Sequence, residues 1–285
     1  MYTTLISAAQ LQALQAAHTP LMVFDCSFDL MQPPAGLQHY RDAHITGAVH
    51  ADLDTALSAK GSADTASGGR HPLPSREKFA DWLGRTGFSN TLQAVVYDRN
   101  GANYCGRLWW MLQWAGHEAV AVLDGGLQAW QAAGGAVRAG DEAPRAPATF
   151  ALGAPLRQLV TTDTVLQKLG RADQTLVDAR AAPRFRGEVE PLDPVAGHIP
   201  GALNRPFSLN LDANGHFKSP AALKTEFAAL LGGRDAASVV HHCGSGVSAV
   251  PNVLAMEIAG FGPTGLYAGS WSEWCSNPSR PAAQG

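Results

Sequence analysis

The chain alternates short apolar runs with longer segments of helical character. Four of the runs, residues 21–25, 94–98, 175–178 and 238–243, are short and rich in Val, Leu and other apolar residues. Such runs are typical of strands buried in a sheet, and their alternation with helical segments is typical of a parallel sheet. We therefore expect an α/β fold in which mostly parallel sheets are flanked by helices.

Capping residues predict where several helices begin and end. Ser219 and Pro220 can serve as N-cap and first helical residue, and the pair Gly232-Gly233 can end that helix. Ser75 and Gly84 can bound a helix in the first half of the chain in the same way. A further helix is expected within residues 248–260.

The sequence repeats itself at about half its length. HITGA at residues 44–48 recurs as HIPGA at 198–202, and DGGLQAW at 124–130 recurs as AGSWSEW at 268–274. So long a period is unlike that of a solenoid and fits two copies of one domain. Because residues 134–155 are rich in Ala, Gly and Pro without periodicity, we place a linker at 141–158, between domains 1–140 and 159–285.

Composition narrows the class of protein. The 285 residues are 46% hydrophobic and 16% charged, with a net charge of −3, which argues against a general nucleic-acid binder. No apolar run approaches the roughly 18 residues of a membrane helix. The N-terminus lacks a signal-peptide pattern, and four cysteines do not make a disulfide framework. We expect a cytoplasmic protein that neither crosses a membrane nor binds nucleic acid.

The hexapeptide CGSGVS at residues 243–248 carries the chemistry. It lies between a predicted strand and a predicted helix, where a glycine-containing loop can aim backbone N–H groups at one point. A thiol held there loses its proton more easily, and the thiolate is the nucleophile. The competing interpretation, a buried inert cysteine, is weakened by the glycines and by the strand–helix frame.

This hexapeptide resembles the active-site loop of the rhodanese-like sulfurtransferases, in the version of the 3-mercaptopyruvate sulfurtransferases. With the repeated motifs in order, the resemblance spans nearly the whole chain. It implies two tandem rhodanese-like domains and a Cys243 that accepts a sulfane sulfur as a persulfide. The sulfur would pass to a thiol or cyanide, with a thioredoxin-like protein as a possible reductant. A monomer without cofactor or metal is expected.

The two copies differ at the decisive position. Asp98 stands in the first copy where Cys243 stands in the second. Since a carboxylate cannot accept a sulfane sulfur, we expect the first domain to be non-catalytic.

Arginines after residue 178 are candidates for binding the donor. Arg184 and Arg186 follow a predicted strand and so lie at the carboxyl edge of the sheet, where open α/β folds bind ligands. A guanidinium can bond two oxygens of a carboxylate or thiosulfate. Arg184 matches the family's substrate-anchoring arginine, and Arg180 is expected to pair with Asp178. Leu192 stands where mercaptopyruvate enzymes usually carry a second arginine.

The loop itself bears on the choice of donor. Gly244, Ser245, Gly246, Val247 and Ser248 are candidate binding residues, and none is charged. An uncharged loop favours 3-mercaptopyruvate, whereas the leucine at position 192 favours thiosulfate, so thiosulfate sulfurtransferase is the alternative.

The resemblance also implies a Ser–His–Asp arrangement that starts at Ser245. His44 matches the histidine, and Asp29 or Asp42 is the acid. Since His198 occupies the same repeat position as His44, a shared structural role competes with this interpretation.

The remaining reactive residues are interpreted as structural. His241 and His242 are expected to be strand residues, and Cys26, Cys105 and Cys275 lack a glycine cradle. No pair of cysteines has metal-ligand spacing, so no zinc site is predicted. Ala268 replaces an aspartate common in relatives, and the sequence offers no reason for it.

Two rival functions remain. A cysteine phosphatase would need an arginine at the end of the loop, where Ala249 stands. A non-enzymatic sulfur carrier or binding module would load sulfur but discharge it slowly.

Overall fold

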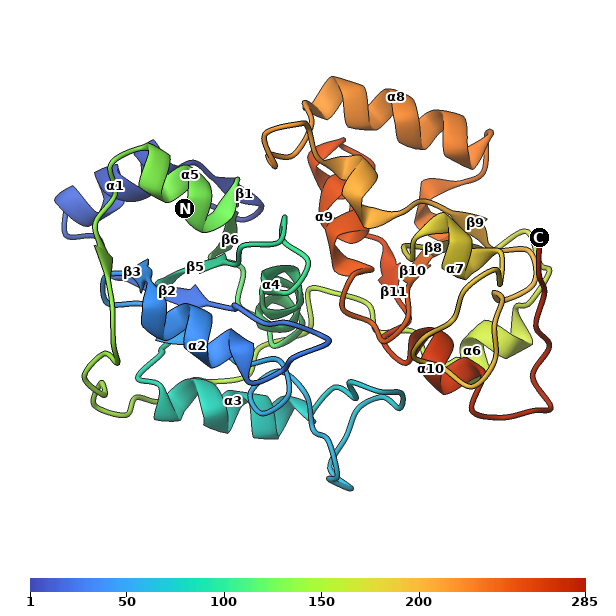
Figure 1. The fold of residues 1–285 in the computed structure, drawn as a ribbon, viewed down its shortest axis with the longest axis horizontal. Coiled ribbons are helices and arrows are strands. Elements are labelled where there is room, and N and C mark those ends of the chain that lie inside the picture. Colours follow the sequence, from blue (N-terminus) through green and yellow to red (C-terminus); the bar gives the residue numbers. More distant parts are fainter. The chain divides into compact units, whose positions relative to one another are not determined.

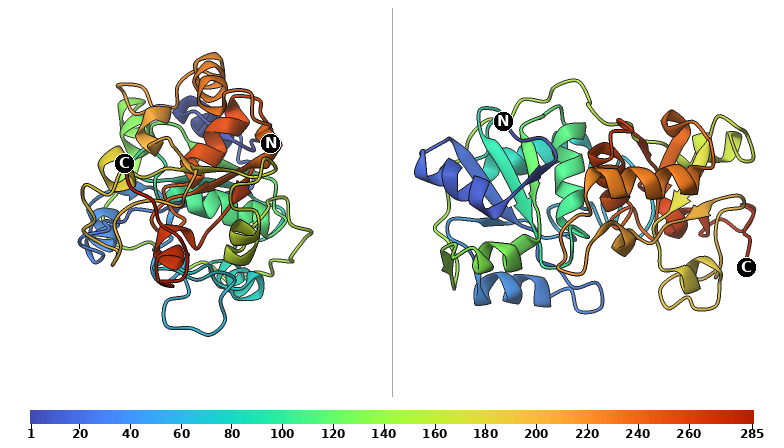
Figure 2. Two further views of the ribbon diagram at one scale, coloured as in Figure 1. Left: turned by 90° about the vertical axis from the view of Figure 1, so that its right-hand side faces the viewer. Right: turned by 90° about the horizontal axis from the view of Figure 1, so that it is seen from above.

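The computed structural model describes residues 1–285, which form two compact units, each with its own sheet (Figure 1; Figure 2). Unit 1 comprises Met1–Asp64, Pro74–Leu156 and Asn214–His216. Unit 2 comprises Thr65–Leu73, Arg157–Ala213 and Phe217–Gly285. Each unit therefore borrows a short segment from the other half of the chain. None of the helices combines the length and apolar character needed to span a membrane.

Unit 1 is built on a five-stranded sheet in the order β1-β6-β5-β2-β4, and every neighbouring pair is parallel. Its strands are β1 (Leu5–Ile6), β2 (Leu21–Asp25), β4 (Val49–His50), β5 (Gln93–Tyr97) and β6 (Val120–Leu123). A separate antiparallel pair joins β3 (His44–Ile45) to β7 (Val137–Arg138). The helices are α1 (Ala8–Ala16), α2 (Ala35–Asp42), α3 (Arg76–Arg85), α4 (Cys105–Trp114) and α5 (Gly126–Ala132).

Unit 2 repeats this plan with a four-stranded parallel sheet in the order β11-β10-β8-β9. Its strands are β8 (Thr175–Asp178), β9 (Leu203–Asn204), β10 (Val239–His242) and β11 (Gly265–Leu266). The helices are α6 (Thr162–Gln167), α7 (Ala182–Phe185), α8 (Pro220–Leu231), α9 (Val250–Ile258) and α10 (Ser270–Trp274), with 3-10 turns at Phe207–Asn210 and Ala236–Ser238. The expected α/β class, with parallel sheets flanked by helices, is confirmed.

Most of the predicted helix ends are confirmed. The Ser219 hydroxyl accepts a hydrogen bond from the Ala222 N–H at the start of α8, and Gly232 ends the helix with φ of 56°. Ser75 caps α3 in the same way. The prediction that Gly84 ends α3 is wrong, because the helix continues through Arg85. Gly84 lies inside α3, where an added Cβ would approach the Ala148 carbonyl oxygen to 2.8 Å.

The segment interpreted as a linker runs largely along unit 1. The Ala148 N–H donates to Gly84 O at 2.9 Å, and the Gly153 N–H donates to Ala115 O at 2.9 Å. Unit 1 includes the whole range Pro74–Leu156. This stretch is thus tied by backbone hydrogen bonds to α3 and to the end of α4.

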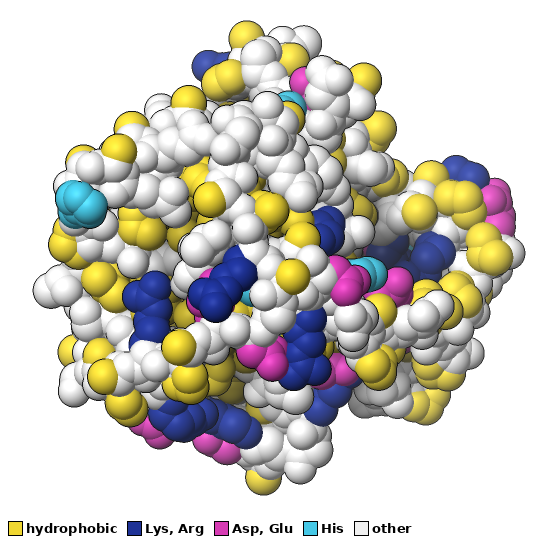
Figure 3. All heavy atoms as spheres, turned by 60° about the vertical axis from the view of Figure 1, so that its left-hand side comes forward, with side chains coloured by type: hydrophobic (Ala, Val, Ile, Leu, Met, Phe, Trp, Pro, Cys, Tyr) yellow, Lys and Arg dark blue, Asp and Glu magenta, His cyan; other side chains and the backbone are white.

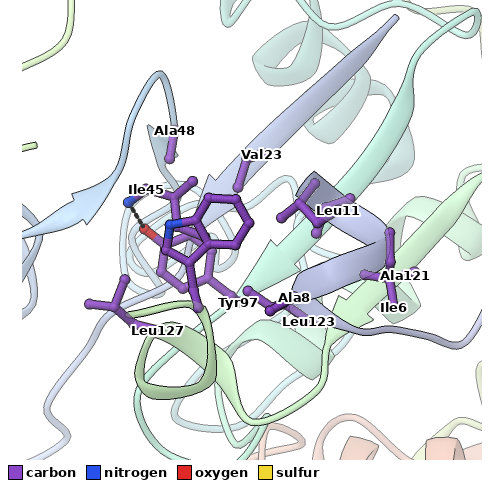
Figure 4. Packing of buried hydrophobic residues seen from close by; sticks show 12 residues of the cluster. Ile6, Ala8, Leu11, Val23, Ile45, Ala48, Tyr97, Ala121, Leu123 and Leu127 are labelled. Atoms are coloured by element: carbon purple, nitrogen blue, oxygen red, sulfur yellow. Dashed lines mark hydrogen bonds between the residues drawn. The ribbon is translucent and has the colours of Figure 1, made fainter. Parts of the chain in front are cut away.

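Each unit buries its own hydrophobic core. In unit 1 the apolar side chains around Val23 and Leu123 pack together, and the Tyr97 hydroxyl accepts the Ile45 N–H at 2.9 Å (Figure 4). In unit 2 Trp271 and Trp274 are completely buried against Val165 and Tyr267. On the face drawn in Figure 3, basic and acidic side chains lie interspersed.

Candidate active site

The loop between β10 and α9 presents Cys243 at the carboxyl edge of the second sheet. Three hydrogen bonds fix its backbone to the start of α10. The Cys243 N–H donates to Ser270 Oγ at 3.0 Å, while Cys243 O and Gly244 O accept from the N–H groups of Trp271 and Ser272 at 3.0 and 2.9 Å. Only 2% of Cys243 is exposed. The thiol is therefore held in one place and shielded from bulk water.

Gly246 gives the loop its turn. Its φ is +74°, and an added Cβ would lie 2.1 Å from the Ala268 carbonyl oxygen, so that no side chain fits. Because the loop turns away from the strand before the helix begins, its backbone N–H groups are not used up by regular structure. Among the hydrogen bonds of the described residues, none engages the N–H groups of Gly244, Ser245, Val247 or Ser248.

Two guanidinium groups lie beside Gly244. An added Cβ at this glycine would be 3.1 Å from Arg70 Nη2 and 3.5 Å from Arg184 Nη1. Arg184 comes from α7, which follows β8, as the sequence predicts for a residue at this edge. Arg70 comes from the Thr65–Leu73 segment that joins unit 2, and sequence reasoning missed it because this segment has no regular pattern.

Two buried carboxylates hold the arginines in place. Asp193 forms an ion pair with Arg70 through one oxygen and accepts from Arg184 Nη2 at 3.3 Å through the other. Glu190 Oε1 accepts from Arg184 Nη2 at 2.6 Å and from the N–H groups of Leu192 and Asp193 at 3.1 Å. The Nε atoms of both arginines are buried without a hydrogen-bond partner. Both guanidiniums thus keep donors in reserve.

Ser245 bonds to a histidine that the sequence analysis did not select. His71 Nδ1 lies 2.7 Å from Ser245 Oγ, and the two residues are 1% and 5% exposed. His71 follows Arg70 on the same borrowed segment, so the stretch Thr65–Leu73 supplies two groups to the site. A motif GRH before a proline was the available signal, although nothing local ties it to residue 245.

The predicted histidine, His44, occupies a different environment in unit 1. It is completely buried, its Nδ1 lies 2.8 Å from Tyr40 O, and its ring stacks on that of Tyr40 at 4.0 Å. His198 in unit 2 repeats this geometry, with Nδ1 at 2.8 Å from Phe185 O and a ring stack at 3.8 Å. The repeated histidines therefore share a packing role, and His71 replaces His44 as the partner of Ser245.

The two candidate acids are also engaged elsewhere. Asp29 accepts the N–H groups of Met31 and Gln32 at 2.8 and 3.1 Å, and Asp42 accepts the Gln38 amide at 2.7 Å. Both carboxylates lie in unit 1 and satisfy local donors, as acids in turns and at helix ends commonly do.

The histidines before Cys243 are strand residues of β10, as expected. Both are completely buried. Burial lowers the pKa of His241 to about 3. Burial also lowers the pKa of His242, although the nearby Asp178 opposes this shift. Both rings are therefore neutral near pH 7, and neither supplies a positive charge to a thiolate.

The other candidates lie apart from the loop. Arg186 is bound to Glu188 through bonds of 2.7 and 2.9 Å on an exposed surface. Arg180 pairs with Asp178 at 2.7 Å, as predicted. Burial raises the pKa of the thiols of Cys26, Cys105 and Cys275. No group of three His, Cys, Asp or Glu side chains is arranged to hold a metal ion.

The corresponding loop of unit 1 is closed by its own side chain. Asp98 follows β5, is 1% exposed, and accepts four backbone N–H groups at 2.8–3.1 Å. The donors belong to Asn100, Ala102, Tyr104 and Cys105. A carboxylate thus occupies the cradle from within.

Comparison with known protein families matches the rhodanese-like domain twice, over residues 7–133 and 161–277. These ranges contain both strand–loop–helix sites. The chain belongs to the rhodanese-like family. The first matched range includes Asp98, and the second includes Cys243 at the equivalent position of the repeat.

Relatives that align with most of the chain are named for both donors. The chain is 45% identical over 282 residues to a probable 3-mercaptopyruvate sulfurtransferase of Pseudomonas aeruginosa, covering 99% of this chain and 98% of the relative. It is 34% identical to a thiosulfate sulfurtransferase of Gallus gallus, covering 89% and 86%. The 3-mercaptopyruvate sulfurtransferase structure from Leishmania major matches with a TM-score of 0.81 at 31% identity, over 98% of this chain and 75% of that one. The expectation of a sulfurtransferase enzyme is confirmed.

Proposed function

We propose that this sulfurtransferase takes sulfur from 3-mercaptopyruvate through a persulfide on Cys243 and passes it to a thiol or cyanide. One observation carries the proposal. Around a single loop, unit 2 gathers a nucleophile, two arginines for a carboxylate and a serine–histidine pair for a carbonyl. Each group of 3-mercaptopyruvate thus has a partner of matching chemistry.

Arg184 and Arg70 are proposed to hold the donor's carboxylate. Arg70 Nη2 and Arg184 Nη1 border Gly244, whereas the bonds to Asp193 and Glu190 use the other Nη atom of each guanidinium. Arg70 then supplies the second fork that Leu192 lacks. This removes the main sequence argument against mercaptopyruvate.

The Cys243 thiolate attacks the donor sulfur, and the carbon–sulfur bond breaks. Its electron pair passes to the carbon chain as the enolate of pyruvate. Ser245 donates a hydrogen bond to the developing oxyanion, and His71, bound to Ser245 Oγ, orients that hydroxyl and exchanges its proton. Protonation of the enolate gives pyruvate. The N–H groups of Gly244, Ser245, Val247 and Ser248 are proposed to cradle the outer sulfur.

Discharge completes the cycle. The acceptor thiolate or cyanide attacks the outer sulfur, the sulfur–sulfur bond breaks, and Cys243 leaves as a thiolate. A thioredoxin-like reductant is a further proposed acceptor, since its thiols can do the same. We also propose a monomer acting in the cytoplasm, where free thiols such as those of this chain stay reduced.

The deciding experiment is steady-state kcat/KM for 3-mercaptopyruvate and for thiosulfate, with cyanide as acceptor. We expect mercaptopyruvate to be preferred, and Ser245→Ala to lower its kcat about 10- to 100-fold while thiosulfate turnover, which needs no carbonyl activation, changes less. Ser276→Ala, at an exposed serine outside the loop, is the control. Preference for thiosulfate, with equal sensitivity of both donors to Ser245→Ala, would favour thiosulfate sulfurtransferase.

A further inference from the structure

Two acids, Glu190 and Asp193, pair with the arginines that are proposed to bind the donor. Arg70 and Arg184 together carry two positive charges, and Glu190 and Asp193 carry two negative ones. Both carboxylates are only 4% exposed, so solvent screens their charges little. The arginine pair is thus offset in the free protein, although it still offers hydrogen-bond donors toward the loop.

The two acids do different work. Glu190 organises its own segment by accepting the N–H groups of Leu192 and Asp193. It also reaches Arg180, which does not border Gly244, at 3.4 Å. Asp193 instead bridges the two arginines that border Gly244, one on each oxygen. Its charge therefore acts on the donor site from both sides.

We propose that Asp193 determines donor specificity by disfavouring doubly charged anions. The inference rests on the proposed function and deepens it. A singly charged carboxylate can use the free donors of both guanidiniums and adds one negative charge. A dianion such as thiosulfate adds two, and its extra charge lies close to the buried Asp193 carboxylate. Since buried charges interact strongly, the dianion is penalised more.

Position 193 also accounts for the neighbouring departure from the family pattern. An arginine at residue 192 would raise the charge of the site, whereas Leu192 adds none and the next residue brings an acid. Burial raises the pKa of Asp193 and Glu190 adds to the rise, while Arg70 and Arg184 oppose it, which is why the test is made well above the ordinary range of carboxyl titration. The proposed selectivity arises from the net charge of the site, because both kinds of anion meet the same two guanidinium groups.

The test is Asp193→Asn, which removes the charge and keeps the shape. At about pH 8, above the usual range of carboxyl titration, we expect the ratio of kcat/KM for thiosulfate to that for mercaptopyruvate to rise about tenfold. Asp193→Glu should leave the ratio within about twofold, because the charge is retained. Glu188→Gln is the matched control: it changes the net charge equally and lies on the same segment, where it pairs with the exposed Arg186.

Binding separates this inference from the proposed function. Sulfate and pyruvate, titrated calorimetrically into wild type and Asp193→Asn, report anion preference without turnover. Tighter sulfate binding relative to pyruvate in Asp193→Asn supports the charge argument even if wild type turns over neither donor, a result that would overturn only the proposed function. Equal losses for both anions and both donors would overturn the inference, since Asp193 would then merely hold the arginines.

Discussion

The loops after β5 and β10 occupy equivalent positions in the two repeats. They differ in whether their backbone N–H groups have an acceptor within the loop. Helices α4 and α9 both begin seven residues after the first loop residue. In unit 1 the Asp98 carboxylate satisfies four N–H groups from inside. In unit 2 the first residue is a thiol, and several N–H groups stay available.

This difference shows what the frame contributes and what one residue decides. A strand that leads through a tight loop into a helix gathers donors at one point, whatever the sequence there. An internal carboxylate makes the cradle a structural element, whereas a cysteine leaves it ready for an external sulfur or anion.

The largest effect is expected at the first residue of each loop, which is Cys243 in unit 2 and Asp98 in unit 1. Cys243→Ser should lower sulfur transfer at least about 1000-fold, because the nucleophile is lost. Asp98→Asn should leave kcat/KM within about threefold, because Asp98 only satisfies its own loop. Mass spectrometry after donor treatment should find one added sulfur atom on wild type and on Asp98→Asn. Full activity in Cys243→Ser would end the assignment.

Substitutions at Gly246 and Gly260 distinguish the effect of close packing from the effect of backbone strain. Gly246→Ala combines a φ of +74° with a Cβ placed 2.1 Å from Ala268 O, so we expect kcat/KM to fall at least about 100-fold as the loop shifts. Gly260→Ala is matched in backbone, with φ of +81°, but meets nothing within 4 Å. It should cost only about 1 kcal/mol of stability and leave activity intact. Similar activity losses in both variants would refute the packing argument.

The closed loop of unit 1 should respond in stability. Asp98→Ala leaves its four N–H groups without their acceptor in a buried place, and we expect a loss of about 3–5 kcal/mol in the free energy of unfolding. Asp98→Asn keeps one carbonyl oxygen and should cost about half as much. Urea unfolding measures both, and equal small effects would mean that water readily replaces the carboxylate.

Strand β10 predicts a dependence on pH. Burial holds the pKa of folded His241 at about 3, against 6.5 as its ordinary value. Between these values the unfolded chain binds a proton that the folded chain excludes, so stability falls as pH falls through this window. His241→Leu should flatten the slope by up to about 1.4 kcal/mol per pH unit. His39→Asn, at an exposed histidine, serves as control, and an unchanged slope in His241→Leu would contradict the cause.

Local signals were strong where adjacent residues act together. Apolar runs predicted β2, β5, β8 and β10, and capping residues predicted the start of α3 and both ends of α8. The internal repeat predicted two domains and aligned Asp98 of the first copy with Cys243 of the second. The prediction for Gly84 is wrong because a glycine can allow close packing inside a helix as well as end a helix, and the sequence does not distinguish these two roles.

By itself the sequence determined the fold class, the repeat and the position of the candidate nucleophile, because strand pattern, capping and a short glycine loop are encoded by neighbouring residues. Tertiary structure alone decided the rest of the site. Ser245 meets His71 across 174 positions of sequence, and Arg70 arrives on the same borrowed segment to lie beside Gly244. Such pairings depend on where a loop without periodicity packs after the sheet has formed, and no local pattern records that.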